Sequence, residues 1–380
     1  MKQLAQDQIR RVRTWIPGKT PASFQAFNAD KSSQDILDLA SNDYLGLSRH
    51  PQLIAAANEI MHVEGVGAGG SRLVTGSRPI HKKLEEALGE WLGREKVLLF
   101  PSGFQANIGA VIALADRHTP VLADKLIHHS LLVGIKASGA KLQRYSHNNL
   151  LDLEKYLKIF QEKYVNKSPL VITESLFSMA GTSPNISELA KLCEKYKARL
   201  LVDEAHALGV LGKSGKGLCY GIQSPVTIIT GTFGKSFGCG GSFIACNKEI
   251  QEHLLQTSGA FRYTTALAPP MCAAALAALN LIQENPNLVK KLQTESIHWR
   301  RTLNKHGWTF PEGIGPIIPL LMGTNQKALK YQQILERKGI LCVAIRPPTV
   351  PEGQACLRLV VRENLPKETL QKLLLALQSP

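Results

Sequence analysis

Short apolar runs alternate with segments of helical spacing through the middle of the chain. The runs lie at residues 97–100, 121–124, 170–174, 199–206 and 226–230. Between two of them, residues 186–196 carry apolar side chains at 186, 189, 190 and 193, the spacing of one helix face, behind the polar starter Pro184-Asn185. This alternation predicts an α/β fold with a mainly parallel sheet covered by helices.

The pattern changes toward the end of the chain. Residues 267–306 are rich in Ala, Leu and Lys and predict helix, broken at Asn285-Pro286. Beyond them the pattern predicts strands near 317–321, 341–345 and 356–361 and a final helix near 366–377. We therefore predict an N-terminal segment at 1–45, a large domain at 46–275 and a smaller α+β domain at 276–380.

The composition is typical of a folded chain. Of 380 residues, 44% are hydrophobic, and no apolar segment is long enough to cross a bilayer, so a cytoplasmic location is expected. The seven cysteines include no Cys-x-x-Cys pair and indicate neither a metal site nor disulfides. The formal charge of +15 favours acidic partners. Because the basic residues are spread over the whole length without a nucleic-acid-binding signature, nucleic acid is not expected among these partners.

Polar motifs directly follow four of the predicted strands. They are Ser102-Gly103-Phe104, Thr173-Glu174-Ser175 with nearby Ser178, Asp203-Glu204-Ala205-His206, and the stretch from Thr230 to Ser236. Open α/β sheets bind their ligands beyond the carboxyl ends of the strands. We therefore expect these motifs to converge on one crevice.

Lys235 is the candidate nucleophile of this crevice. It stands between Gly234 and Ser236, where an aldehyde could approach its amine closely, and a crevice with apolar walls would keep that amine partly unprotonated. An ordinary surface lysine beside a glycine turn is the alternative. Thr232 and the backbone N–H groups of Gly103-Phe104 could hold a phosphate, although both motifs also occur in plain turns.

Asp203 and two histidines complete the candidate set. Asp203 ends an apolar strand, where a buried carboxylate needs a partner such as a pyridinium nitrogen; a helix or turn cap is the alternative. His206 could bind a phenolic oxygen of the same ring, or could be a satisfied core histidine. His128 could stack against the ring, with the adjacent His129 as the competing choice.

Over nearly all its length the chain resembles the α-oxoamine synthases, which are fold-type I pyridoxal-phosphate enzymes. The matching blocks are ASNDYLGLSRHP (40–51), GAGGSRLVTGSRPIHKKLEEALGEWLG (67–93), FPSGFQAN (100–107), ADKLIHHSLL (123–132), TESLFSMAG (173–181), VDEAHALGVLG (202–212), TGTFGKSFGCGG (230–241) and AIRPPTVPEGQACLRL (344–359). The resemblance implies pyridoxal phosphate as cofactor and the decarboxylative condensation of an amino acid with an acyl thioester. The RPPTVP block (346–351) favours members that use L-alanine and pimeloyl-CoA or a pimeloyl acyl carrier protein over relatives that use glycine.

The resemblance also implies a role for each matching residue. Lys235 is implied to form the Schiff base, Asp203 to pair with the pyridinium nitrogen and His206 to contact the phenolic oxygen. His128 is implied to stack on the ring and to contact substrate. The further cofactor contacts are Gly103, Phe104, Ser178 and Thr232.

Other implied contacts concern the second subunit and the substrates. The stretch Tyr263-Thr264-Thr265 is implied to reach the cofactor phosphate of a partner subunit, so a homodimer with active sites at its interface is expected. Thr349, Arg358 and Arg13 are the implied substrate contacts. The chain departs from the commoner family pattern at Ser236, in DEAHALG (203–209) and in MAG (179–181). These departures bear on fine specificity rather than on activity.

Overall fold

The computed structural model describes residues 7, 9–26, 35–163 and 167–378 and forms two compact units. The larger unit comprises Leu47–Phe177 and Ser183–Val289, and the smaller one Met1–Gly46, Ser178–Thr182 and Lys290–Pro380. This division differs from the predicted ranges in three respects. Residues 178–182, inside the predicted large domain, belong to the smaller unit. The N-terminal segment groups with the C-terminal residues instead of standing apart, and the boundary lies at residue 290 instead of 276.

A seven-stranded sheet forms the centre of the larger unit, in the order β4-β10-β9-β8-β7-β5-β6. The strands are β4 (Lys96–Phe100), β5 (Pro120–Asp124), β6 (Lys141–Tyr145), β7 (Leu170–Glu174), β8 (Arg199–Asp203), β9 (Val226–Thr232) and β10 (Ser242–Cys246). Only β10 runs antiparallel to its neighbours, so the predicted mainly parallel sheet is confirmed.

Two strands of this sheet, β6 and β10, were not predicted from the sequence pattern, for different reasons. The edge strand β6 has the sequence KLQRY and is largely exposed, so it carries no apolar run. Strand β10, with the sequence SFIAC, is fully buried, but it directly follows the glycine-rich stretch 238–241 and is only five residues long. Its antiparallel pairing is a tertiary property that a local pattern does not encode.

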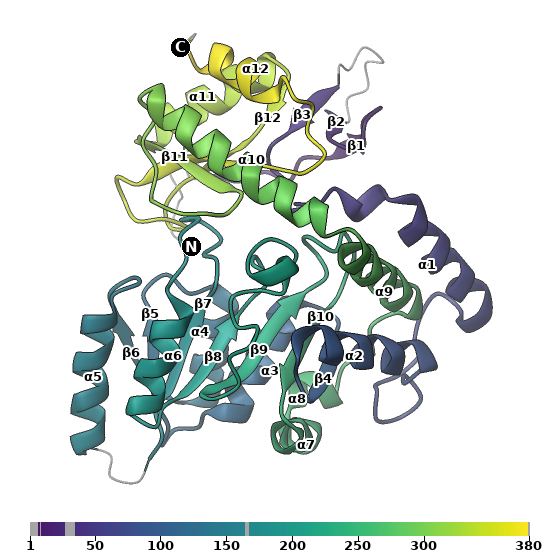
Figure 1. The fold of residues 1–380 in the computed structure, drawn as a ribbon, viewed down its shortest axis with the longest axis vertical. Helices are drawn as coiled ribbons and strands as arrows, with labels where there is room; N and C mark the ends of the chain where they lie inside the picture. The colour runs from purple at the N-terminus through teal and green to yellow at the C-terminus, as the bar shows by residue number, and fades with distance from the viewer. Residues whose placement is uncertain (1–6, 8, 27–34, 164–166, 379–380) are drawn as a thin grey trace. The chain divides into compact units, whose positions relative to one another are not determined.

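Helices cover both faces of this sheet. The helices of this unit are α1 (Pro51–Glu64), α2 (Pro79–Leu92), α3 (Gly103–Leu114), α4 (His129–Ser138), α5 (Leu150–Lys163), α6 (Ile186–Lys195), α7 (Lys248–Thr257), α8 (Gly259–Arg262) and α9 (Pro269–Glu284). The chain steps outward from β5 to β6 through α4 and then back to β7 through α5. Right-handed crossovers therefore put α5 and α6 on the face opposite α3 and α4, as Figure 1 shows for α6 and α3.

This reversal creates a switch point in the sheet between β5 and β7. The connections that leave the two strands run in opposite directions there, which opens a crevice at the carboxyl ends of the strands. Asp124, Glu174 and Asp203 are the last residues of β5, β7 and β8, and all three are buried. The order of the strands therefore brings three carboxyl groups to one edge of the sheet.

The smaller unit contains two short sheets. One has the order β1-β2-β3-β12 and the other β11-β14-β13. Their strands are β1 (Trp15–Pro17), β2 (Ser23–Ala26), β3 (Ile36–Asp38), β11 (Ile317–Gly323), β12 (Ile340–Leu341), β13 (Val343–Ile345) and β14 (Ala355–Val360), and the helices are α11 (Asn325–Arg337) and α12 (Thr369–Leu377). Helix α10 (Pro286–Lys305) starts at the predicted break and carries the chain from one unit into the other. None of the described helices is both long and apolar enough to span a membrane.

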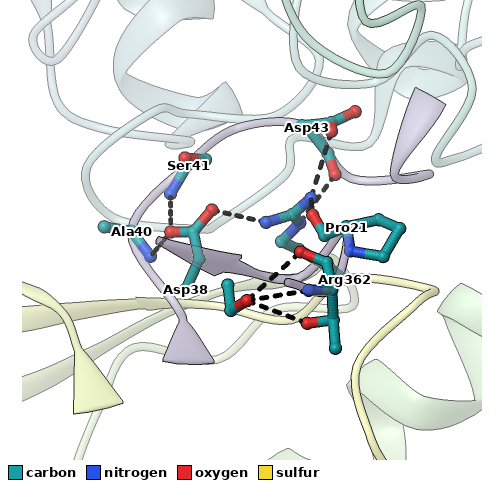
Figure 2. A network of polar contacts seen from close by, with 8 residues as sticks. Pro21, Asp38, Ala40, Ser41, Asp43 and Arg362 are labelled. Atoms are coloured by element: carbon teal, nitrogen blue, oxygen red, sulfur yellow. Dashed lines mark hydrogen bonds and ion pairs between the residues drawn. The ribbon is translucent and has the colours of Figure 1, made fainter. Parts of the chain in front are cut away.

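A buried ion-pair network explains why the N-terminal segment belongs to the smaller unit. Strand β3 pairs in parallel with β12, and its last residue, Asp38, is fully buried. Figure 2 shows the Asp38 carboxylate accepting from the guanidinium of Arg362 and from the N–H groups of Ala40 and Ser41. Arg362, only 3% exposed, also donates to Asp43 Oδ2 at 3.1 Å. Both buried charges are thus neutralised and fully hydrogen-bonded.

We predict that Asp38→Ala destabilises the protein by about 3 kcal/mol, because it leaves the Arg362 guanidinium buried without its main counter-charge. Urea unfolding followed by tryptophan fluorescence measures the loss. Glu188→Ala, which removes an exposed partner of Lys191, is the matched control and leaves the unfolding midpoint almost unchanged. Equal midpoints for the two variants would contradict the role given to the network.

Candidate active site

The strand-end motifs of the larger unit converge on one cavity of about 230 Å³. Its lining residues are Gly103, Phe104, Asn107, His128, Glu174, Asp203, Ala205, His206, Thr230, Gly231, Thr232, Gly234 and Lys235. A larger cavity of about 570 Å³ lies at the amino ends of the strands, where Arg94 and Arg199 are among its walls. The first cavity is the candidate site because it gathers a lysine, two carboxyl groups and two histidines. Among the described residues, no group of three or more His, Cys, Asp or Glu could hold a metal ion.

A tight loop after β9 presents Lys235. The loop is closed by hydrogen bonds from the Gly238 N–H to Lys235 O at 2.9 Å and from the Cys239 N–H to Phe233 O at 2.8 Å. Gly238 has φ +65° there, and a Cβ on it would lie 2.4 Å from Ser48 N, so only glycine fits. The backbone thus fixes the position from which the lysine side chain starts.

Asp203 accepts hydrogen bonds from two donors. Its Oδ2 accepts from the Asn107 amide at 2.7 Å, and its Oδ1 accepts from the Ala205 N–H at 2.9 Å. The side chain is 5% exposed, and hydrogen bonds of this kind stabilise the charged form of a buried acid. The capping alternative is partly present as well, because the Ala205 bond closes the turn after β8.

A chain of hydrogen bonds connects Asp203 to His128. Asn107 Nδ2 also donates to Ser130 Oγ at 2.9 Å, and Ser130 Oγ lies 2.7 Å from His128 Nδ1. The Ser130 N–H donates to the same nitrogen, so Nδ1 is an acceptor and the neutral ring carries its proton on Nε2. Burial lowers the pKa of His128; Asp203 opposes that effect and Lys235 adds to it. The ring is therefore a neutral wall of the cavity.

The other predicted cofactor contacts divide between residues inside and outside the cavity. His206, 6% exposed, lines it, whereas His129 does not. Gly103 starts α3 behind the cap Ser102, so its N–H and that of Phe104 belong to the four that have no partner within the helix. A Cβ on Gly103 would lie 3.6 Å from Thr232 Cβ, so the two motifs predicted to bind phosphate lie close together.

Ser178 and Arg358 belong to the smaller unit and contact each other. Arg358 Nε donates to the Ser178 carbonyl at 2.8 Å, and Arg358 Nη2 donates to Asn42 Oδ1 at 2.9 Å. Thr264 and Thr265 lie in the larger unit outside the cavity, and Thr264 Oγ1 donates to the Thr265 carbonyl at 3.4 Å. The expected contact of these threonines with a second subunit stays a prediction.

A third cavity, of about 840 Å³, lies within the smaller unit, and the predicted substrate contacts Arg13 and Thr349 line it. Arg13 is already paired there, because both its terminal nitrogens bond the Glu336 carboxylate. Arg10, which the sequence analysis did not single out, donates to Thr349 Oγ1 at 3.1 Å. Among the described residues, the Arg10 guanidinium donates only to a hydroxyl and a carbonyl oxygen, so Arg10 is better placed than Arg13 to receive an anion.

The structure adds Asn107, Ser130 and Glu174 to the predicted site. Asn107 also accepts from Thr230 Oγ1 at 2.7 Å, so its amide connects β8, β9 and the start of α4. The sequence did contain a signal for Asn107, because it is a polar residue on the otherwise apolar, buried face of helix α3. Glu174 was recognised only as part of the motif after the third apolar run.

Comparison with known proteins agrees with this geometry. Residues 34–377 match the family described as aminotransferase class I and II, and the chain therefore belongs to that family. Its curated relatives narrow the class to the 8-amino-7-oxononanoate synthases. The enzyme of that name from Nitrosospira multiformis is 41% identical over 361 residues, which cover 94% of this chain and 90% of the relative. The one from Marinomonas sp. is 37% identical over 362 residues, which cover 94% and 87%.

Solved structures of related enzymes are also similar to this chain. The chain is similar to the serine palmitoyltransferase of Sphingomonas wittichii, with a TM-score of 0.89, 27% identity, and coverage of 95% of this chain and 90% of the other. It is also similar to the 8-amino-7-oxononanoate synthase of Francisella tularensis, with a TM-score of 0.77, 28% identity, and coverage of 92% and 97%. The predicted resemblance and the fold class are confirmed.

We predict that His128 titrates below its ordinary pKa of 6.5. A lowered pKa means that the unfolded chain binds the proton more readily, so the contribution of His128 to stability is complete above pH 6.5 and is lost as the pH falls through the folded-state value. NMR titration of the ring protons, assigned with the variant His128→Phe, measures the pKa. Titration at or above 6.5 would contradict the neutral ring.

Proposed function

We propose that this chain condenses L-alanine with a pimeloyl thioester, with loss of CO₂, and so makes 8-amino-7-oxononanoate for biotin biosynthesis. The observation that carries the proposal is the gathering of Lys235, Asp203, His206 and His128 in one cavity. This set occurs in a chain 37% and 41% identical to enzymes named for that product. The RPPTVP block at 346–351 supports alanine over glycine as the amino acid.

The cavity has the groups that pyridoxal phosphate requires. Lys235 supplies an amine and Asp203 a charged carboxylate for the ring nitrogen, while His206 would contact the phenolic oxygen. The amino end of α3 at Gly103 and Phe104, with Thr232, would hold the phosphate. When bound, the cofactor links to amines as a Schiff base and withdraws electrons from the α-carbon of the amino acid.

The residues of the chain perform the remaining tasks. Lys235 Nζ accepts the proton from the alanine α-carbon and later returns a proton to the product. Asp203 would place its carboxylate against the ring nitrogen and would so keep the electron demand of the ring high. His128 forms one wall of the cavity and would help to keep water from the reacting carbon.

Residues outside this cavity complete the proposal. Ser178 would contact the cofactor, and Arg358 would bind a substrate carboxylate through its fork of N–H donors. Thr264 and Thr265 would bind the phosphate of the cofactor in a partner subunit, which makes the working enzyme a homodimer. The acyl group arrives as pimeloyl-CoA or on an acyl carrier protein, and both are acidic partners suited to a chain of charge +15.

The test is to identify the product by mass spectrometry after mixing the cofactor-loaded protein with alanine and each pimeloyl thioester. We expect 8-amino-7-oxononanoate and CO₂ from at least one thioester. Lys235→Ala should lower turnover by about 1,000-fold or more, because the nucleophile and the base are lost together. Lys191→Ala, on the exposed face of α6, is the control and keeps full turnover. Product from glycine but not from alanine would overturn the substrate assignment.

A second prediction concerns the free carboxylate at the far end of the pimeloyl chain. We expect Arg10→Ala to raise the KM for the pimeloyl thioester about tenfold, the size of one lost charge-assisted hydrogen bond, with little change in kcat. Arg13→Ala is the matched comparison and should raise the KM less, since Glu336 already neutralises Arg13. A larger effect at Arg13 would restore the role predicted from the sequence.

A further inference from the structure

Glu174 is a buried acid of the cavity to which the proposed reaction gives no role. It is the last residue of β7, is 2% exposed, and lines the cavity with Lys235. Its register partner on the neighbouring parallel strand β8 is Asp203. Two carboxyl groups therefore stand side by side at the carboxyl edge of the sheet, in a place with little water to separate their charges.

The surroundings of the two acids differ in hydrogen bonding. Asp203 accepts from the Asn107 amide and from the Ala205 N–H, one at each oxygen. Glu174 receives a hydrogen bond from the His128 backbone, while its Oε1 is buried and has no hydrogen-bond partner among the described residues. When two neighbouring acids have unequal environments, the better-hydrogen-bonded one keeps the charge and the other keeps the proton.

The charges near Glu174 agree with this division. Burial raises the pKa of Glu174 well above its ordinary value of 4.5, and Asp203 and Asp124 raise it further. Lys235 and the His128 hydrogen bond act in the opposite direction but do not outweigh burial. Asp124, the last residue of β5, accepts from His147 Nδ1 at 2.8 Å and from the Asn148 N–H at 2.9 Å.

We propose that Glu174 works as a neutral carboxylic acid, accepting from the His128 backbone at Oε2 and donating the O–H at Oε1 to the cofactor in the cavity. The inference rests on the proposed function, because it takes pyridoxal phosphate as the occupant. Glu174 positions His128 at the start of α4 and offers the cofactor a donor that adds no second negative charge beside Asp203. The cavity then holds one carboxylate for the ring nitrogen and one acid for an electron-rich oxygen.

Glutamine is the decisive substitution, because its amide reproduces both the acceptor and the donor of a neutral acid. We expect Glu174→Gln to bind pyridoxal phosphate with a dissociation constant within about threefold of the parent, since no hydrogen bond is lost. Glu174→Leu loses both bonds and should weaken binding about tenfold or more. Cofactor absorbance, titrated into the apoprotein, gives both constants. An equal loss in the two variants would overturn the proposal, because it would mean that a carboxylate is required.

Infrared spectroscopy of the apoprotein reports the proton directly. At pH 7 the difference between parent and Glu174→Gln should contain the C=O band of a protonated carboxyl group, which shifts in D₂O. Glu188→Gln makes the same change at an exposed carboxylate and should give no such band. A carboxylate band in the Glu174 difference would overturn the proposal, even if Glu174→Leu failed to fold. Because the infrared measurement involves neither alanine nor thioester, it separates failure of this inference from failure of the proposed reaction.

Discussion

The site depends on keeping one carboxylate charged in a place where charge is costly. Asp203 stands at the end of a buried strand, and burying a carboxylate without hydrogen-bond partners costs free energy. The Asn107 amide and the Ala205 N–H prevent this by supplying two donors. The same amide accepts from Thr230 and donates to Ser130, so one buried side chain connects β8, β9 and the start of α4. The fold itself thus supplies the hydrogen-bond donors that a carboxylate at this position requires.

The other titratable groups of the cavity are arranged around that charge. Burial keeps the His128 ring neutral, and its Nδ1 ends the hydrogen-bond chain that starts at Asp203. Burial also favours the proton on Glu174, the strand neighbour of Asp203. In a cavity with little water, each additional charge would compete with the pairing of ring nitrogen and carboxylate. Neutral neighbours leave that pairing undisturbed.

Much of the fold could be predicted from the sequence, because the buried strands of a parallel sheet are continuous apolar runs and their ends carry the polar motifs. Strands β4, β5, β7, β8 and β9 and the break before α10 are confirmed. Local pattern could not reveal the exposed edge strand β6, nor the pairing of β3 with β12, which joins segments about 300 residues apart. These are tertiary pairings, and they also explain why the N-terminal segment groups with the C-terminal residues.

The residues of the candidate site likewise include some that could be predicted from the sequence and others that could not. Residues at or just beyond the end of a strand, such as Asp203 and Lys235, could be found from their position and residue type. The blocks that match the family supplied their expected roles. Asn107 could not be recognised as the central hydrogen-bonding residue, because its three partners come from distant parts of the chain. The choice between Arg10 and Arg13 likewise depends on Glu336, which only the folded chain brings to Arg13.

The most direct test of the account is to locate the covalent attachment of the cofactor. Borohydride treatment of the cofactor-loaded protein fixes pyridoxal phosphate to the amine that carries it, and peptide mass spectrometry then identifies the labelled residue. The account predicts a single phosphopyridoxyl group, on Lys235. Labelling of a different lysine, or a protein that takes up no cofactor at all, would contradict it.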